Sequence, residues 1–173
     1  MEETLENSCF ISVHRNQINP VLDPKSTLTF AYGDGKYPKF ARSMAASDNV
    51  LRTKILVEVN EDFHQCDKLN ISLDSDLPDQ LIKCFSEKDH DEIRELASRA
   101  IRKVACSERG REFLVERELV VDIMKLIDDK EVAIRSNAYH ALINIAEFTY
   151  GVDSIIEFDI IPVLVDKLVQ EKD

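Results

Sequence analysis

Tryptophan is absent from this chain, and glycine and proline are scarce, because the 173 residues include only four glycines and five prolines. So few turn-forming residues disfavour a β-sandwich or barrel, which needs many turns between short strands. With 44% hydrophobic and 32% charged residues, the composition is that of a globular protein with a real core. The sequence therefore predicts packed helices.

Positive charge is also in short supply, because 22 Lys and Arg residues face 33 Asp and Glu residues, a net charge of −11. A protein that binds nucleic acid normally presents a basic face, so we expect no nucleic-acid partner. Basic protein partners would suit the charge, although solubility alone would also explain it. The apolar clusters are too short to span a bilayer, and the N-terminus lacks a secretory signal. We expect no membrane association and a cytoplasmic location.

Catalytic and metal-binding patterns are missing as well. The chain has no GxSxG or HExxH motif, and Gly33-Asp34-Gly35-Lys36 lacks the spacing of a P-loop. A zinc site usually needs four ligands at paired spacing, which the cysteines do not show. We expect no enzyme, no metal, no cofactor and no small-molecule substrate. Reduced, buried thiols are expected at all four cysteines, Cys9, Cys66, Cys84 and Cys106.

What the chain does have is an internal repeat. Residues 93–127 align with residues 134–168 at a constant shift of 41 and without a gap, so that Gly110 falls on Gly151. A weaker copy, beginning near Leu51, lies 42 residues further back. A period of roughly 40 residues is typical of a solenoid of stacked helical units, and solenoids present extended surfaces to partners.

In each unit, the sequence predicts a long helix, a glycine turn, a short helix, a tight corner and a second long helix. We expect Gly110 and Gly151 at the breaks, where the backbone often needs φ above zero. Residues 64–76 are polar and poorly periodic, and no helix is expected there. From apolar spacing, helices are expected at about 26–32, 36–46, 50–61, 77–87, 93–106, 111–116, 119–127, 134–148, 153–157 and 161–169.

The third unit resembles an armadillo repeat. Ala141-Leu-Ile-Asn-Ile-Ala146 is similar to the family's ALxNLA core, and Asp159-Ile-Ile-Pro-Val-Leu-Val165 resembles its GAIPxLV start, with Asp159 where the family prefers glycine. HEAT repeats are the neighbouring assignment, but the short middle helix and Pro162 favour armadillo. The resemblance implies an all-α fold, a right-handed α-solenoid of armadillo-like (ARM/HEAT) repeats with an extended N-terminal arm.

The chain is expected to divide into two parts. Residues 1–22 lack helical period and form the extended arm, whose apolar residues Phe10 and Ile11 are candidates for docking on a partner. Residues 23–173 form the armadillo-like repeat domain. This domain divides into a helical lead-in at 23–47 and units at about 48–88, 89–129 and 130–173.

A narrower resemblance lies in short N-terminal pieces. Residues 18–25, Ala31-Tyr-Gly33 and Leu51-Arg52-Thr-Lys54 resemble the opening of the radial spoke head protein 14 homologues of motile cilia. This resemblance implies a non-catalytic part of the axonemal radial spoke, with other spoke or axonemal subunits as partners and a location in the cytoskeleton of a cilium or flagellum. Two alternatives stay open, a cytosolic armadillo adaptor that binds peptide segments and a regulatory subunit of an enzyme complex.

Armadillo proteins bind extended segments along a groove lined by their third helices, through the asparagine of ALxNLA and the residue four before it. The matching residues here, from the third unit back to the first, are His140 and Asn144, Arg99 and Lys103, and Val57 and Glu61. Only Asn144 keeps the asparagine, so a grip along the whole groove is not expected. We hypothesise that Arg99, Lys103, His140 and Asn144 bind an acidic segment; a solvated face without a partner is the open alternative.

Arginine also recurs at the start of each long third helix, as Arg52, Arg94 and Arg135. A guanidinium at this position can bind acidic groups or helix-end carbonyls. We therefore expect these three residues to hold neighbouring units together rather than to bind a partner.

The last predicted helix is apolar and includes Leu164 and Leu168, but no polar cap follows it. The final repeat of a solenoid normally carries a polar outer face. We expect this end to be covered by another chain, with Leu164 and Leu168 in the contact, or the sequence to be a fragment of a longer protein.

Overall fold

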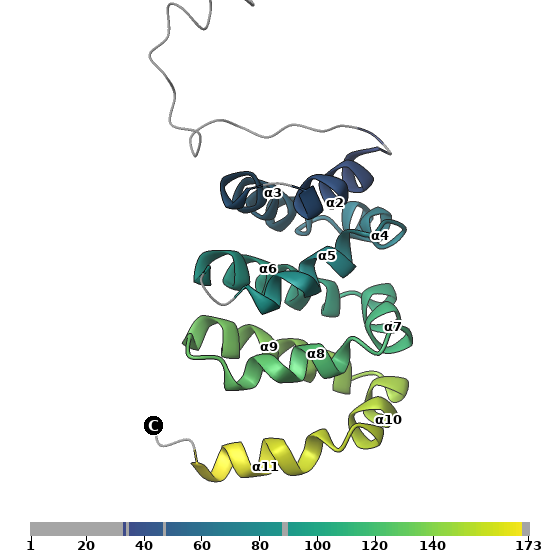
Figure 1. The fold of residues 1–173 in the computed structure, drawn as a ribbon. Helices are drawn as coiled ribbons and strands as arrows, with labels where there is room; N and C mark the ends of the chain where they lie inside the picture. Colours follow the sequence, from purple (N-terminus) through teal and green to yellow (C-terminus); the bar gives the residue numbers. More distant parts are fainter. Residues whose placement is uncertain (1–32, 34, 47, 88–89, 171–173) are drawn as a thin grey trace, which may run out of the picture.

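The computed structural model describes residues 33, 35–46, 48–87 and 90–170, and within these residues it is an all-α solenoid without strands. The predicted fold class is confirmed. The helices stack in layers, from α2 at one end to α11 at the other (Figure 1). The α-helices are α2 (Lys36–Ala46), α3 (Asn49–Asp62), α4 (Cys66–Leu73), α5 (Leu77–Lys83), α6 (Asp91–Ala105), α7 (Glu108–Glu116), α8 (Val120–Lys125), α9 (Val132–Ala146), α10 (Thr149–Glu157) and α11 (Ile160–Gln170), and the 3-10 helices η2 (Cys84–Ser86) and η3 (Leu126–Asp128) extend α5 and α8.

The helices fall into three columns (Figure 1). The long helices pack in the order α3, α6, α9, and the short helices in the order α4, α7, α10. The middle helices α5 and α8 pack on the long helices α6 and α9 that follow them. Each repeat therefore contains a long, a short and a middle helix, in the order in which the sequence repeat predicts its three helices.

Small side chains allow the long helices to approach closely. Ala97 and Ala100 of α6 are fully buried, and Ala138 and Ala141 occupy the same places on α9. Larger side chains fill the space beside these alanines. They include Ile93, Ile101 and Val104 on α6 and Ile134 and Ile145 on α9, all nearly inaccessible. Because an alanine carries only one methyl group, two helix backbones can meet there without a cavity.

The helices found in 36–62 and 77–170 agree with the predicted ones to within a few residues at their ends. The stretch 64–76 is different, because it contains α4, where no helix was expected. This helix is eight residues long, and its apolar face consists of Leu69 and Leu73. Such a short segment shows little periodicity, and packing against α5 and α7 stabilises it. The predicted arm with Phe10 and Ile11, and the predicted helix at 26–32, lie outside the described residues.

The two repeated glycines do not break the chain, so that part of the prediction was wrong. Gly110 lies inside α7 and Gly151 inside α10, both buried and without positive φ. A Cβ atom on Gly110 would overlap the carbonyl oxygen of Val104, and one on Gly151 would overlap that of Ile145. Glycine is required here because each short helix sits directly against the end of the preceding long helix.

The tight corners between short and middle helices are where the backbone turns left-handed. Glu118 has φ of 55° and Asp159 has φ of 53°, and the two residues are one repeat apart. This conformation strains residues with a Cβ atom. Asp159 is the position at which the armadillo pattern has glycine, so the structure explains why that pattern prefers it.

The recurring arginines bind acidic groups or carbonyls at helix ends, as predicted. Arg52 on α3 is ion-paired with Glu87, which ends η2, at 2.7 Å. Arg94 on α6 makes the same contact one unit later, with Asp129 at the end of η3. Each pair joins a long helix to the chain that enters the next long helix.

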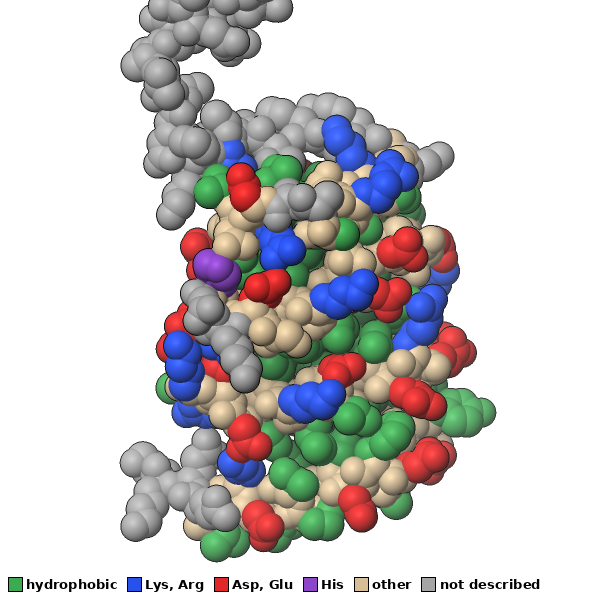
Figure 2. All heavy atoms as spheres, viewed as in Figure 1, with side chains coloured by type: hydrophobic (Ala, Val, Ile, Leu, Met, Phe, Trp, Pro, Cys, Tyr) green, Lys and Arg blue, Asp and Glu red, His purple; other side chains and the backbone are tan. Residues whose placement is uncertain are grey.

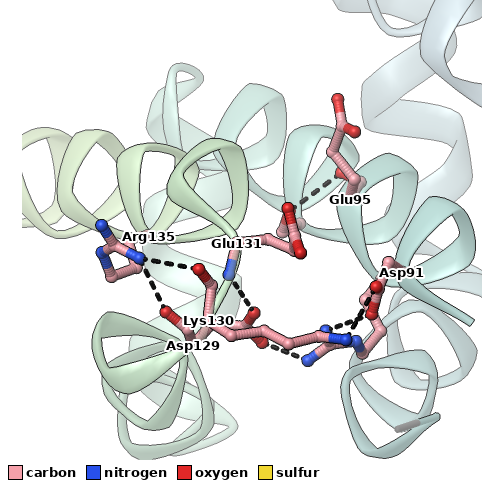
Figure 3. Close-up of polar contacts among 8 residues, drawn as sticks. Asp91, Glu95, Asp129, Lys130, Glu131 and Arg135 are labelled. Atoms are coloured by element: carbon pink, nitrogen blue, oxygen red, sulfur yellow. Dashed lines mark hydrogen bonds and ion pairs between the residues drawn. The ribbon is translucent and has the colours of Figure 1, made fainter. Parts of the chain in front are cut away.

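Arg135 also contacts the loop between η3 and α9, but through the backbone (Figure 3). Its guanidinium donates to the backbone carbonyls of Asp129 at 2.9 Å and Lys130 at 3.1 Å. The Lys130 side chain reaches across to Asp91, at the start of α6, at 2.8 Å. The loop before α9 is thereby fastened to α9 on one side and to α6 on the other.

Candidate functional site

The third-helix face is the surface formed by the outward side chains of α3, α6 and α9, namely Val57, Glu61, Arg99, Lys103, His140 and Asn144. The structure brings the four candidate residues onto adjacent helices, with Arg99 and Lys103 on α6 and His140 and Asn144 on α9. Arg99 and His140 are exposed, whereas Lys103 and Asn144 are half-buried. The four positions can therefore contact one ligand that crosses from α6 to α9.

Lys103 is the most constrained of these residues. Its ammonium group donates to the backbone carbonyl of Asn60 on α3 and lies 3.1 Å from Nε2 of His64. This contact places the lysine across the junction of two units, so it both joins α6 to α3 and remains partly accessible.

The pKa of Lys103 is lowered, chiefly because partial burial disfavours its charged form. Glu61 opposes this effect, but the neighbouring positive charges of Arg99 and Arg102 lower the pKa further. Three positively charged side chains, Arg99, Arg102 and Lys103, thus lie close together on this part of α6. A negatively charged group placed here would be favoured.

Arg99 is paired with Glu95, one helical turn earlier on α6. Both side chains are substantially exposed to water. An exposed ion pair of this kind contributes only a few tenths of a kcal/mol, about 0.3–0.5 for an i,i+4 pair on a helix. Arg99 can therefore exchange Glu95 for the carboxylate of a ligand at little cost.

His140 and Asn144 supply polar groups on the neighbouring helix. Nδ1 of His140 lies 2.8 Å from the carbonyl oxygen of Ser136, to which a protonated Nδ1 donates, and this leaves Nε2 for a ligand or solvent. The Asn144 amide donates to Sγ of Cys106 at 3.3 Å, which links α9 to α6. Asn144 therefore has one contact within the protein and retains its carbonyl oxygen for others.

Cys106 belongs to this surface, although the sequence did not single it out for that role. It caps the end of α6 and is exposed. Its position, three residues after Lys103 and seven after Arg99, places it on the same helical face. This spacing could have predicted that Cys106 lies on the third-helix face, but all four cysteines were expected to be buried.

The expectation of buried cysteines was correct only in part. Cys84 is a buried, reduced thiol, and burial raises its pKa to about 11. Cys66 and Cys106 are exposed, so the prediction was wrong for both. The reason is that Cys66 begins α4 and Cys106 follows the last residue of α6, and these helix ends lie at the surface. Cys9 lies outside the described residues.

The two candidate residues of α11 differ in environment. Leu164 is half-buried and packs against the core, whereas 79% of Leu168 is exposed. Exposed hydrophobic side chains gather at the lower end of the molecule, over α11 and the layer above it (Figure 2). The C-terminal layer therefore presents apolar surface to solvent within the described part of the chain.

A cavity of about 400 Å³ lies between the turn that follows α4 and the outer side of α7. Charged residues make up most of its lining, and Arg109 and Asp74 form an ion pair there. Small-molecule sites are usually lined by apolar side chains with a few polar groups, so this cavity does not resemble one. Over the residues described, no cluster of potential metal ligands occurs, and no helix is long and apolar enough to cross a membrane.

No protein-family model matches this chain. Among solved structures it is similar to two engineered proteins studied by the Northeast Structural Genomics Consortium. The first has a TM-score of 0.71 at 18% identity, and the match covers 79% of this chain and 56% of that one. The second has a TM-score of 0.70 at 18% identity, and the match covers 76% of this chain and 33% of that one. This chain is also similar to a designed armadillo repeat protein in complex with the peptide (KR)4, with a TM-score of 0.65 at 17% identity over 71% and 52%.

At these identities the likeness concerns the fold, which is an armadillo-like solenoid. The chain spans between a third and little more than half of the length of these structures. The armadillo resemblance read from the third unit is therefore supported at the level of fold.

Proposed function

We propose that this chain is a non-catalytic protein-interaction scaffold whose third-helix face binds an extended, acidic segment of a partner protein. The observation that carries the proposal is the grouping of Arg99, Arg102 and the half-buried Lys103 on α6, where the two arginines add to the lowering of the Lys103 pKa that burial causes. A carboxylate beside these groups would gain charge-assisted hydrogen bonds and would relieve their mutual repulsion.

The comparison with the peptide-bound designed protein supports peptide binding by a solenoid of this fold. That protein is in complex with (KR)4, a basic peptide. On α6 of this chain the ligand-facing positions carry Arg99 and Lys103, so the preferred charge of the ligand is reversed. Because Val57 and Glu61 on α3 offer no matching groups, we assign binding to α6 and α9 and not to the whole surface.

The test compares two double variants with equal charge change in a pull-down with an acidic peptide. Arg99→Glu with Lys103→Glu should weaken binding at least about tenfold, since both contacts become repulsive. Arg117→Glu with Lys125→Glu alters two exposed residues, one directly after α7 and one at the end of α8, and should leave binding unchanged. Circular dichroism verifies that both variants are folded. Equal binding by all three proteins would remove the third-helix face as the site.

For the biological setting, we propose the radial spoke of a motile cilium or flagellum, on the resemblance of the N-terminal pieces. The predicted organisation, an arm at 1–22 followed by the lead-in and three units of 23–173, suits a part that docks several neighbours. Such a part should remain in a salt-washed axonemal pellet. A cytosolic adaptor, the second candidate and the one favoured by the peptide-bound structure, should instead appear in the soluble fraction with its ligand.

A further inference from the structure

The α11 helix has a direct counterpart within the same molecule. At the shift of 41, Ile161 corresponds to Val120 of α8, and Leu168 corresponds to Ile127 of η3. The two earlier residues are 0% and 1% exposed, whereas Ile161 and Leu168 are 49% and 79% exposed. The same sequence positions are thus covered in one unit and uncovered in the next.

The uncovered residues lie on a single side of α11. We call this side the α11 outer face; it consists of Ile161, Val165, Leu168 and Val169, all exposed. Their spacing of i, i+4, i+7 and i+8 makes a continuous apolar stripe along the helix. The opposite side of α11 contacts the preceding layer, where Ile160 is fully buried. Figure 2 shows hydrophobic side chains at this end of the molecule.

The molecule itself shows which kind of element covers such a face. The middle helix α5 packs against the long helix α6, and α8 packs against α9. These two long helices share one apolar pattern: an aliphatic residue, then alanines four and seven positions later, then aliphatic residues at positions eight and eleven. The residues are Ile93, Ala97, Ala100, Ile101 and Val104 on α6, and Ile134, Ala138, Ala141, Leu142 and Ile145 on α9.

The charges around the α11 outer face are mainly negative. Four exposed acidic residues occur on or beside α10 and α11, at Asp153, Glu157, Asp159 and Asp166. Lys167 of α11 is ion-paired with Asp128 of the preceding layer. Two copies of this end placed face to face would bring like charges together, which disfavours a homodimer. A partner with basic residues beside its apolar stripe fits better.

We propose that the α11 outer face binds an amphipathic helix of a partner protein that carries the apolar spacing of α6 and α9, flanked by Lys or Arg. This inference goes beyond the proposed function, because it assigns a second binding surface and names the class of partner for it. The partner helix takes the place that α9 takes against α8. Its basic residues meet the acidic residues Asp153, Glu157, Asp159 and Asp166 beside the apolar stripe.

The test uses a labelled helical peptide with the α9 apolar residues at their native spacing and lysines at the outward positions. Fluorescence anisotropy measures its binding to the whole chain. Leu168→Glu should weaken binding at least about tenfold, because it puts a charge in the apolar contact. The matched control Ile71→Glu changes an exposed apolar residue on α4 and should have no effect.

Three results would overturn the inference. One is equal binding by a peptide of the same composition with scrambled spacing. Another is a homodimer, detected by light scattering, that Leu168→Glu dissociates, since this would assign the face to a second copy. The third is a difference in amide hydrogen exchange. If residues 161–169 exchange much more slowly in the wild-type monomer than in the Leu168→Glu variant, the chain covers the α11 outer face itself.

The failure of this inference can be told apart from the failure of the proposed function. The double variant Arg99→Glu with Lys103→Glu alters the third-helix face and leaves α11 unchanged, so it should bind the helical peptide normally. Loss of acidic-peptide binding alone concerns the third-helix face, and loss of helical-peptide binding alone concerns α11.

Discussion

The guanidinium of Arg94 on α6 is paired with the carboxylate of Asp129, 35 residues later at the entrance to α9, and both side chains are largely buried. Arg52 and Glu87 make the same contact one unit earlier, with the same separation. Asp91 provides Arg94 with a second carboxylate at 2.7 Å. The same ion pair thus recurs in successive units and joins each long helix to the loop that leads into the next one.

Removing Asp129 should destabilise the fold strongly. Asp129→Ala leaves the buried guanidinium of Arg94 with one exposed partner, and breaking a buried pair in this way costs about 3 kcal/mol. Urea denaturation measures the loss in the free energy of unfolding. The control Asp122→Ala removes an exposed i,i+3 partner of Lys125 and should cost less than about 0.5 kcal/mol. Equal losses in the two variants would contradict a structural role for the Arg94 pair.

Adding a single methyl group at Gly110 should be costly. Gly110→Ala forces α7 away from the carbonyl of Val104, and overpacking of this kind costs about 1–3 kcal/mol. Gly151→Ala should behave alike, because its Cβ atom would meet the carbonyl of Ile145. At Gly35 a Cβ atom meets nothing within 4 Å, so Gly35→Ala should be close to neutral. Thermal unfolding of the three variants tests this order.

The stability of the first layers should depend on pH through Asp62. This buried carboxylate joins three helices, with Lys36 of α2 and Lys68 of α4 as its ion-pair partners. Burial by itself would raise the pKa of Asp62, but the hydrogen bonds from the two lysines outweigh it and the pKa is lowered from 3.8. The contribution to stability is therefore complete above the unfolded pKa and is lost as the pH falls through the folded value.

Asp62→Asn isolates this contribution. The variant should be less stable than the wild-type protein at pH 7, where the carboxylate is charged. The difference in the free energy of unfolding should shrink as the pH falls below about 4, where Asp62 of the unfolded chain takes up a proton while the folded carboxylate is still charged. Urea denaturation at several pH values measures it. A difference that does not change with pH would show that the charge of Asp62 is not what matters.

Glycine at Asp159 should stabilise the protein. Asp159 has φ of 53°, a conformation that strains a residue with a Cβ atom, so Asp159→Gly should raise the free energy of unfolding by roughly 0.5–1 kcal/mol. Glu157→Gly, at the end of α10, should lower it, because there glycine only adds flexibility to a helix. If both changes destabilise the protein, the strain at this corner is negligible.

Much of this fold could be predicted from the sequence because its signals are local. The spacing of Ile93, Ala97 and Val104 is visible in a single helix, and the shift to Ile134, Ala138 and Ile145 repeats it. The role of Arg94 was also predictable, since a charged residue recurring beside a buried stripe needs a nearby partner. In contrast, α4 was missed, because eight residues with two leucines show almost no period.

The position of the third-helix face could be predicted from the sequence, but the burial and contacts of its residues could not. Helical spacing placed Arg99 and Lys103 on one face, and the repeat placed His140 and Asn144 beside them. That Lys103 is partly buried against Asn60 of the preceding unit depends on a contact across 43 residues. The exposure of Cys106 likewise depends on where α6 ends relative to its neighbours.

The sequence by itself determined the unit of this protein, its length and its apolar stripe, because an α-helix is built from neighbours three and four residues apart. Only the tertiary structure decided why Gly110 is glycine, how far Lys103 on α6 is buried and which side of α11 stays uncovered. These features arise where separate helices meet. The distance between two helix backbones, and the water excluded between them, are properties of the packed units and cannot be obtained from one helix alone.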